Sequence, residues 1–331
     1  MLRGAGKLHG NDLSSSPQNS SWKMISRRNI RVKVMQTLYT SGTLETENKP
    51  GEPQKVLLKH FEETSDLFFY LTYFIIELAH YAETDASIRA GKHLPNYQDL
   101  HVNTKIAGNE ILEKMEHDLS LKQQFEKRKL AYRMDKELLR KMYGQLAATP
   151  RYLQYIGHAE RDKKEEREIL EFIFNDLMLA NENFLAHIED NFSNWEDDGE
   201  MLIQLLLGCL QKPASANYNE MISAEKLSFA KNLLRTVLEK AEHLQSIIVP
   251  KLKNWDPERI AQLDMILMKM GVAEFLYFET IPPKVTINEY IDLAKDYSTA
   301  QSGQFVNGIL DNIHKELVQE GKMQKVDFKK A

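Results

Sequence analysis

The sequence predicts an all-α protein, and three observations support this class. Leu, Glu, Lys and Met are frequent, whereas only 15 Gly and 10 Pro occur among 331 residues, and such usage favours helices. The last third of the chain repeats its apolar residues at helical spacing, and no segment shows the apolar–polar alternation of a half-buried strand. The shares of hydrophobic residues, 42%, and of charged residues, 27%, are those of a globular protein rather than a disordered or membrane protein.

The chain is expected to begin with a disordered leader followed by one helix. Residues 1–23 are polar and lack an apolar core long enough for a signal peptide, and Met24 is a candidate natural start. Ser26 is a good N-cap for a helix that extends to about residue 40, whose apolar side chains leave little polar face. The following run, TSGTLETENKPGEPQ, is rich in Gly, Pro and polar residues and predicts a loop that closes the segment 24–44.

Residues 45–222 are predicted to form an acidic block of long helices, broken at HLPNYQD, AATPRY, NWEDDGE and QKPASANY. The most apolar run in it, at 67–82, is shorter than the ~20 residues of a membrane span and is interrupted by Glu77 and His80. We therefore expect a buried helix there and no membrane association. The lone cysteine, Cys209, has no partner for an internal disulfide and is expected to pack as a small hydrophobe, which fits a reducing cytoplasm.

Residues 223–320 are predicted to form a C-terminal core of four helices. One amphipathic helix is expected over 223–249. The next helix should start with Asp256 as N-cap and Pro257 at the first helical position, where the missing N–H of proline is harmless.

The remaining two helices follow a pair of prolines. Pro282–Pro283 should end the second helix, and Thr286 with Glu289 three residues later forms a capping-box pattern for the third. A fourth helix is expected in QFVNGILDNIHKEL, and residues 321–331 are expected to be a flexible basic tail.

The sequence offers no catalytic or cofactor motif. A four-helix di-metal site needs two Glu-x-x-His units, and the chain contains one, Glu77 to His80, for which a histidine packed in the core is the more common explanation. The other histidines lack the spacing of zinc ligands. The chain also lacks a P-loop, a dinucleotide glycine fingerprint and a nucleophile motif, so we expect neither enzymatic activity nor a cofactor.

The first helix carries an unusual cluster of cations: Lys23, Arg27, Arg28, Arg31 and Lys33 fall in a window without a single acidic residue. Each cation in the first turn of a helix is unfavourable by roughly 0.3–1 kcal/mol. Cations beside exposed backbone N–H groups do, however, form a good receptor for phosphate. Two interpretations remain open from these features: a nucleic-acid surface, or internal pairing with carboxylates of the acidic middle block.

The chain resembles the NusB family of transcription antitermination factors. The resemblance is carried by RRNIRVKVMQTLY and KVTINEYIDLAKDYSTAQSGQFVNGILD, of which INE-x-x-x-LAK followed by FVNG-x-LD is the most specific part. It covers roughly residues 26–41 and 224–318. The resemblance implies a helical bundle of two small subdomains, a N-terminal one packed on a C-terminal one, here with the block 45–222 as a large additional helical insertion.

The resemblance also implies a function without catalysis or cofactor. Members of the family bind boxA RNA of ribosomal-RNA transcripts together with NusE, a ribosomal small-subunit protein, and help RNA polymerase read through terminators. The RNA surface carried over by position consists of Arg27, Arg28, Arg31, Gln36, Tyr39, Gln301, Gln304, Phe305 and Asn307. Arginines would hold phosphates, while the aromatic and amide side chains would contact unpaired bases.

Two of the positions assigned to RNA contact from the family resemblance, Phe305 and Gln304, need comment. Phe305 is equally compatible with a core position, and Gln304 replaces the lysine usual in the family, which would remove one phosphate contact. The NusE surface carried over by position is a helix with Glu258, Arg259 and Asp264.

Two other classes of function compete with this interpretation. A NusB-like domain also resembles the N-terminal portion of a ribosomal-RNA cytosine methyltransferase, but that enzyme would require a glycine-rich cofactor loop and catalytic cysteines. The other alternative is a non-catalytic helical scaffold whose arginines pair internally.

Overall fold

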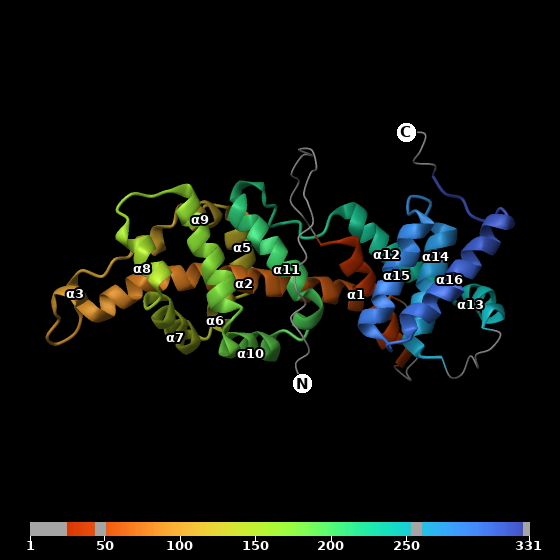
Figure 1. Cartoon of the computed structure of the whole chain (residues 1–331), viewed down its shortest axis with the longest axis horizontal. Coiled ribbons are helices and arrows are strands. Elements are labelled where there is room, and N and C mark those ends of the chain that lie inside the picture. The colour runs from red at the N-terminus through yellow and green to blue at the C-terminus, as the bar shows by residue number, and fades with distance from the viewer. Residues whose placement is uncertain (1–24, 44–50, 253–259, 327–331) are drawn as a thin grey trace.

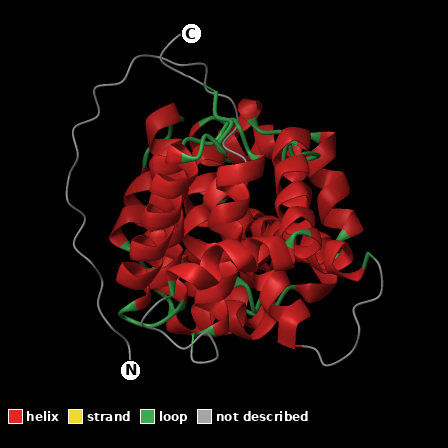
Figure 2. Cartoon of the chain, turned by 90° about the vertical axis from the view of Figure 1, so that its right-hand side faces the viewer, coloured by secondary structure: helices red, strands yellow, loops and turns green. Residues whose placement is uncertain are grey.

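The computed structural model describes residues 25–43, 51–252 and 260–326, and this part of the chain consists of helices and loops (Figure 2). The all-α prediction is therefore confirmed. The predicted leader 1–23 lies outside the described residues. In chain order the elements are α1 (Arg27–Thr43), α2 (Glu52–Ala90), α3 (Tyr97–Leu100), η1 (Lys105–Gly108), α4 (Glu110–Glu116), α5 (Leu119–Lys127), α6 (Leu130–Arg133), α7 (Lys136–Ala147), α8 (Pro150–Gly157), α9 (Lys163–Phe172), η2 (Ile173–Met178), α10 (Glu182–Asn191), α11 (Trp195–Gln211), η3 (Pro213–Ser215), α12 (Ala224–Glu239), α13 (Ala241–Ile248), η4 (Val249–Lys251), α14 (Gln262–Tyr277), α15 (Pro283–Tyr297) and α16 (Ser302–Gln319).

Helix α2 connects two separate hydrophobic cores. Its first turns bury Leu57 and Phe61 in a C-terminal core, and from Leu67 onward it forms the centre of a second core in the middle block. Figure 1 shows this helix along the long axis of the molecule, with the middle-block helices around one part of it and α12–α16 at the other end. The predicted insertion thus shares its first helix with the rest of the fold.

The middle core confirms the buried helix predicted at 67–82. Within it Phe68, Phe69 and Phe74 are fully buried in α2, and Cys209 of α11 is buried as a free thiol. Its sulfhydryl donates to the carbonyl oxygen of Leu205 at 3.1 Å, and burial raises its pKa well above the ordinary value. Among the described residues no helix is long and apolar enough to cross a membrane.

The C-terminal core combines α1 with α12–α16, so the first helix does not form a subdomain apart from the last ones. Ile30, Val34 and Met35 of α1 are buried in the same cluster as Leu234 and Leu310. Helices α14, α15 and α16 pack closely where α14 carries Gly271: a Cβ at this position would lie 2.9 Å from Leu310 Cδ2. Glycine is therefore required for this approach.

Several helix boundaries differ from the predictions. The helix expected over 223–249 is broken at Lys240 into α12 and α13. Residues Asp256 and Pro257 lie outside the described residues, and α14 begins only at Gln262, after the non-helical Ile260. The run NWEDDGE is not a break but the first turns of α11, because acidic side chains favour the N-terminal end of a helix.

The capping box predicted at Thr286 and Glu289 is wrong. Helix α15 already begins at Pro283, where proline needs no N–H partner, so Thr286 lies inside the helix and is buried. Its hydroxyl donates to Glu274 Oε2 of α14 at 2.9 Å.

Two residues of the predicted tail 321–331, Lys325 and Val326, contact the end of α14 and the residues after it. Lys325 Nζ donates to the carbonyl oxygens of Glu274 and Phe278, both at 2.7 Å, and Val326 N donates to Glu279 O at 3.1 Å. The ammonium thus caps the carbonyl end of α14. Residues 327–331 lie outside the described part.

Candidate nucleic-acid interface

The N-terminus of α1 presents two arginines at the surface. Ser26 is the N-cap, as predicted, because its hydroxyl oxygen accepts from Asn29 N at 3.1 Å. Arg27 and Arg28 follow in the first turn, with side chains 40% and 38% exposed. Both guanidinium groups pair with carboxylates of this chain: Arg27 with Glu225 at 2.7 Å and Arg28 with Asp296 at 2.5 Å.

Arg31 does not belong to this surface, and its assignment to the RNA contacts is wrong. Its side chain is 2% exposed and binds Glu274 through two hydrogen bonds of 2.7 and 3.1 Å, with Glu289 at 3.2 Å. Tyr290 and Thr286 donate to the same Glu274 carboxylate. Burial opposes the charge of Arg31, but the hydrogen bonds and charge of Glu274 outweigh it and raise the guanidinium pKa above its ordinary value.

Lys33 is internal as well, and here the partner does come from the middle block. Its ammonium lies 2.9 Å from Asp198 Oδ1 of α11, and both side chains are buried. Asp198 also accepts from Thr64 of α2 and Asn194, each at 2.7 Å. This network ties α1, α2 and α11 together. All four cations thus pair with carboxylates of this chain, but the pairs of Arg31 and Lys33 are buried, while those of Arg27 and Arg28 lie at the surface.

Further along α1, Gln36 and Tyr39 border a cavity of about 480 Å³ between three segments. Gln36 Nε2 donates to Asp197 Oδ2 at 2.5 Å, and the Tyr39 side chain is 45% exposed. The other lining residues come from the same helix, from the start of α14 and from the connection between α15 and α16: Met35, Thr40, Ala261, Gln262, Leu263, Tyr297, Ser298 and Thr299. The cavity therefore joins α1 to the segment just before Gln301.

The first turns of α16 extend this surface. Gln301, Gln304 and Asn307 are exposed, whereas Phe305 is half-buried against the C-terminal core. Half-burial against the core supports the core alternative for Phe305, and its contact with RNA stays a prediction.

The residues carried over as the NusE surface are not placed together. Glu258 and Arg259 lie outside the described residues, and Asp264 is buried, so its assignment to an exposed partner surface is wrong. Asp264 Oδ2 accepts from Ser302 Oγ at 2.8 Å, and Ser302 in turn contacts Thr299. Asp264 therefore fixes the turn that precedes α16 and carries Gln301.

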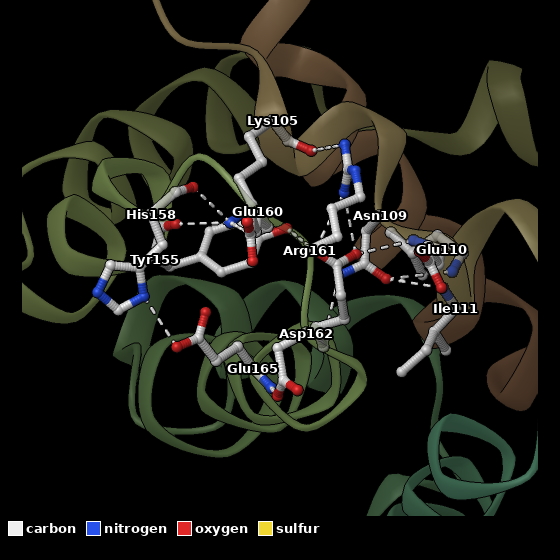
Figure 3. Close-up of polar contacts among 12 residues, drawn as sticks. Lys105, Asn109, Glu110, Ile111, Tyr155, His158, Glu160, Arg161, Asp162 and Glu165 are labelled. Atoms are coloured by element: carbon white, nitrogen blue, oxygen red, sulfur yellow. Dashed lines mark hydrogen bonds and ion pairs between the residues drawn. The ribbon is translucent and has the colours of Figure 1, made fainter.

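A dense polar cluster in the middle block offers no second site of this kind (Figure 3). Lys105 Nζ donates to the carbonyl oxygens of Tyr155, His158 and Glu160 at 2.9–3.0 Å. The buried Glu166 accepts from Arg161, Tyr155 and the N–H of Glu110. These bonds join η1, α4, α8 and α9 and leave the charged groups compensated, so the cluster stabilises the block. Within the described residues no group of three or more His, Cys, Asp or Glu side chains could hold a metal ion.

Sequence reasoning missed the carboxylates that surround the arginines. Glu274 is fully buried in α14, and a single acid in the apolar run GVAEFLYF was a usable signal for a buried ion pair. Glu225, Asp296 and Asp197 gave no comparable signal because they lie among other charged residues.

Comparison with known proteins decides the family. The model of the NusB family matches residues 167–315. A protein from Exiguobacterium sp., named transcription antitermination protein NusB, is 41% identical over 88 residues, which cover 27% of this chain and 69% of that protein. The chain belongs to the NusB family. A NusB from Salinibacter ruber is 43% identical over 97 residues, or 29% of this chain and 61% of the relative.

The alignments with NusB proteins cover only part of this chain and only part of each relative. The chain spans less than two thirds of the length of several curated NusB relatives, for example 46% of the protein from Chloroherpeton thalassium. A solved structure of T. maritima NusB shares 29% identity, covers 39% of this chain and 82% of its own, and superimposes with a TM-score of 0.28. The family match starts at residue 167, inside the middle block, rather than at 224, and it does not include α1.

Proposed function

We propose that this chain is an RNA-binding transcription antitermination factor that acts without catalysis or cofactor. It binds boxA-type single-stranded RNA of ribosomal-RNA transcripts together with NusE, and it does so in a complex with RNA polymerase. The proposal rests on membership of the NusB family, several relatives of which are named transcription antitermination proteins.

The observation that carries the RNA part is that α1 lines one cavity together with the connection between α15 and α16. Arg27 and Arg28 supply exposed guanidinium groups at a helix N-terminus, which suits phosphate. Gln36 and Tyr39 border a cavity whose far wall leads directly to Gln301. An amide and an aromatic ring at its edge suit an unpaired base, whose faces stack and whose edges take hydrogen bonds. Gln304, Phe305 and Asn307 would extend the contact along α16.

Replacing Arg27 and Arg28 by Ala tests this proposal. RNA binding should weaken, and the log–log salt slope should fall by roughly 0.7 for each lost phosphate contact. Thermal stability should change little, because exposed ion pairs are worth only about 0–1 kcal/mol. Arg140→Ala is a matched control, since Arg140 forms a comparable exposed pair with Glu137 in the middle block.

The scaffold alternative predicts a different result for the same double variant. If Arg27 and Arg28 serve only as internal partners of Glu225 and Asp296, RNA affinity and the salt slope stay unchanged. A scrambled RNA of equal length, measured with NusE present, tests the sequence-specific part: equal affinity for both RNAs would reject it.

A further inference from the structure

Three carboxylates contact three accessible polar side chains of α1, namely Arg27, Arg28 and Gln36. Glu225 in the first turn of α12 holds Arg27, and Asp296 near the end of α15 holds Arg28. Asp197 in the first turn of α11 accepts a hydrogen bond from Gln36. The three acids come from three elements, and each approaches a different α1 side chain of the proposed RNA surface.

These contacts can be exchanged, unlike those of the neighbouring buried cations. The carboxylates of Glu225 and Asp296 are 77% and 55% exposed, so water can replace them at little cost when another anion binds the arginine. Arg31 and Lys33, by contrast, are buried together with their partners Glu274 and Asp198.

Asp197 extends the arrangement to the cavity. Besides contacting Gln36, it lies near Tyr297: burial raises the pKa of the Tyr297 hydroxyl, and the Asp197 carboxylate raises it further. Both Gln36 and Tyr297 line the cavity between α1 and the connection to α16. The carboxylate that contacts the lining of this cavity thus belongs to α11 of the middle block.

We propose that Glu225, Asp296 and Asp197 compete with RNA for α1, the first two with phosphates at the arginines and Asp197 with a base at Gln36, and thereby limit the affinity of the chain for RNA. The inference rests on the proposed function. It gives the middle block a specific effect on the RNA surface, because α11 supplies one of the three competing anions. Glu225 and Asp296 hold the two arginines and so compete with phosphates, and their effect should be the same factor for any single-stranded RNA.

The test measures the affinity of the full chain for a boxA-like RNA and for its scrambled counterpart. The variants are Glu225→Gln, Asp296→Asn, Asp197→Asn and the triple substitution, which preserve side-chain shape. At about 0.1 M salt Glu225→Gln and Asp296→Asn should each tighten binding about threefold, from charge repulsion in water over ~5 Å. The triple variant should reach roughly tenfold, and the gain should shrink at higher salt because the charges are screened.

Glu137→Gln is the control, since it removes the same charge from an exposed pair in α7 of the middle block. Affinities equal to this control, or weaker than it, would overturn the inference and show that the acids orient α1 rather than compete. If neither the unmodified chain nor any variant binds either RNA, the proposed function itself fails and the inference falls with it. Thermal melts identify any variant that fails to fold. If Asp197→Asn fails to fold, the substitutions of the exposed residues, Glu225→Gln and Asp296→Asn, still test the inference.

Discussion

Neighbouring arginines of α1 have opposite environments. Arg27 and Arg28 lie at the surface with exposed partners, while Arg31, one turn later, is enclosed with Glu274. Sequence could place all three in the first turns of one helix and could justify the Ser26 cap. It could not distinguish their environments, because Glu274 lies 243 positions away and the pairing depends on how α14 packs on α1.

Arg31→Ala should destabilise the protein by about 3–5 kcal/mol, because it leaves the Glu274 carboxylate buried without its counter-charge. Arg27→Ala, which breaks an exposed pair, should cost less than about 1 kcal/mol. Denaturant unfolding monitored by circular dichroism measures both. Equal costs for the two variants would show that the Arg31 network contributes no more than a surface pair.

His60 should make stability depend on pH. Burial lowers its pKa, and the nearby Lys33 ammonium lowers it further, so the folded state favours the neutral ring. Below the ordinary value of about 6.5 the unfolded chain takes up this proton first. The free energy of unfolding should therefore fall as pH decreases from about 6.5 to the lowered pKa of His60. Below that pKa, His60 should cause no further change with pH. His60→Gln should flatten this dependence in unfolding curves between pH 5 and pH 7.5, and an unchanged curve would refute the assignment.

At the scale of single elements, helix ends were the least predictable feature. The sequence predicted a cap at Ser26 from its residue type and one at Thr286 from its capping-box pattern with Glu289, and only Ser26 is a cap. Pro283 starts α15 earlier, and the Thr286 hydroxyl then finds a buried acceptor on another helix. A local pattern cannot report such a tertiary competitor.

The contact of Lys325 with the C-terminal end of α14 leads to a further prediction. Lys325→Ala should destabilise the protein by about 1.5–3 kcal/mol, because two charge-assisted hydrogen bonds to the carbonyl oxygens of Glu274 and Phe278 are lost. Lys322→Ala is the control, since Lys322 pairs with the nearby exposed Glu320 and its loss should leave the melting temperature almost unchanged. Thermal melts of both variants check this, and similar melting temperatures would contradict the capping role.

At the scale of the whole molecule, α2 should make the two cores unfold together. Ser65 lies between the part of α2 in the C-terminal core and the part in the middle core, and it is buried. Ser65→Pro removes a helical hydrogen bond and costs roughly 3 kcal/mol or more. It should separate one cooperative transition into two, seen as different hydrogen-exchange rates for α7 and α16.

Ser87→Pro provides the comparison, because it interrupts the exposed end of α2 beyond both cores. It should leave a single transition for α7 and α16. Two transitions in the unmodified chain would show that α2 does not couple the cores.

The helical character of the middle block and its buried apolar run were predictable from composition and spacing. The sharing of α2 between two cores was not, because Leu57 and Phe61 follow the same apolar periodicity as the residues after them. Periodicity shows which face of a helix is buried but not which partner covers it. The same reason explains why the candidate RNA positions Gln36 and Gln301 followed from a family resemblance, whereas Arg27 was also indicated by the cluster of cations.

The continuity of α2 also fixes a length. A helix of 39 residues spans about 58 Å at 1.5 Å per residue. Helix α2 separates the α3 end of the molecule, where Leu94 and Tyr97 are exposed, from the α1 surface. A molecule in contact with that end would stand at a set distance from any RNA on α1, and its reach toward the transcript would be determined by the number of helical turns between them.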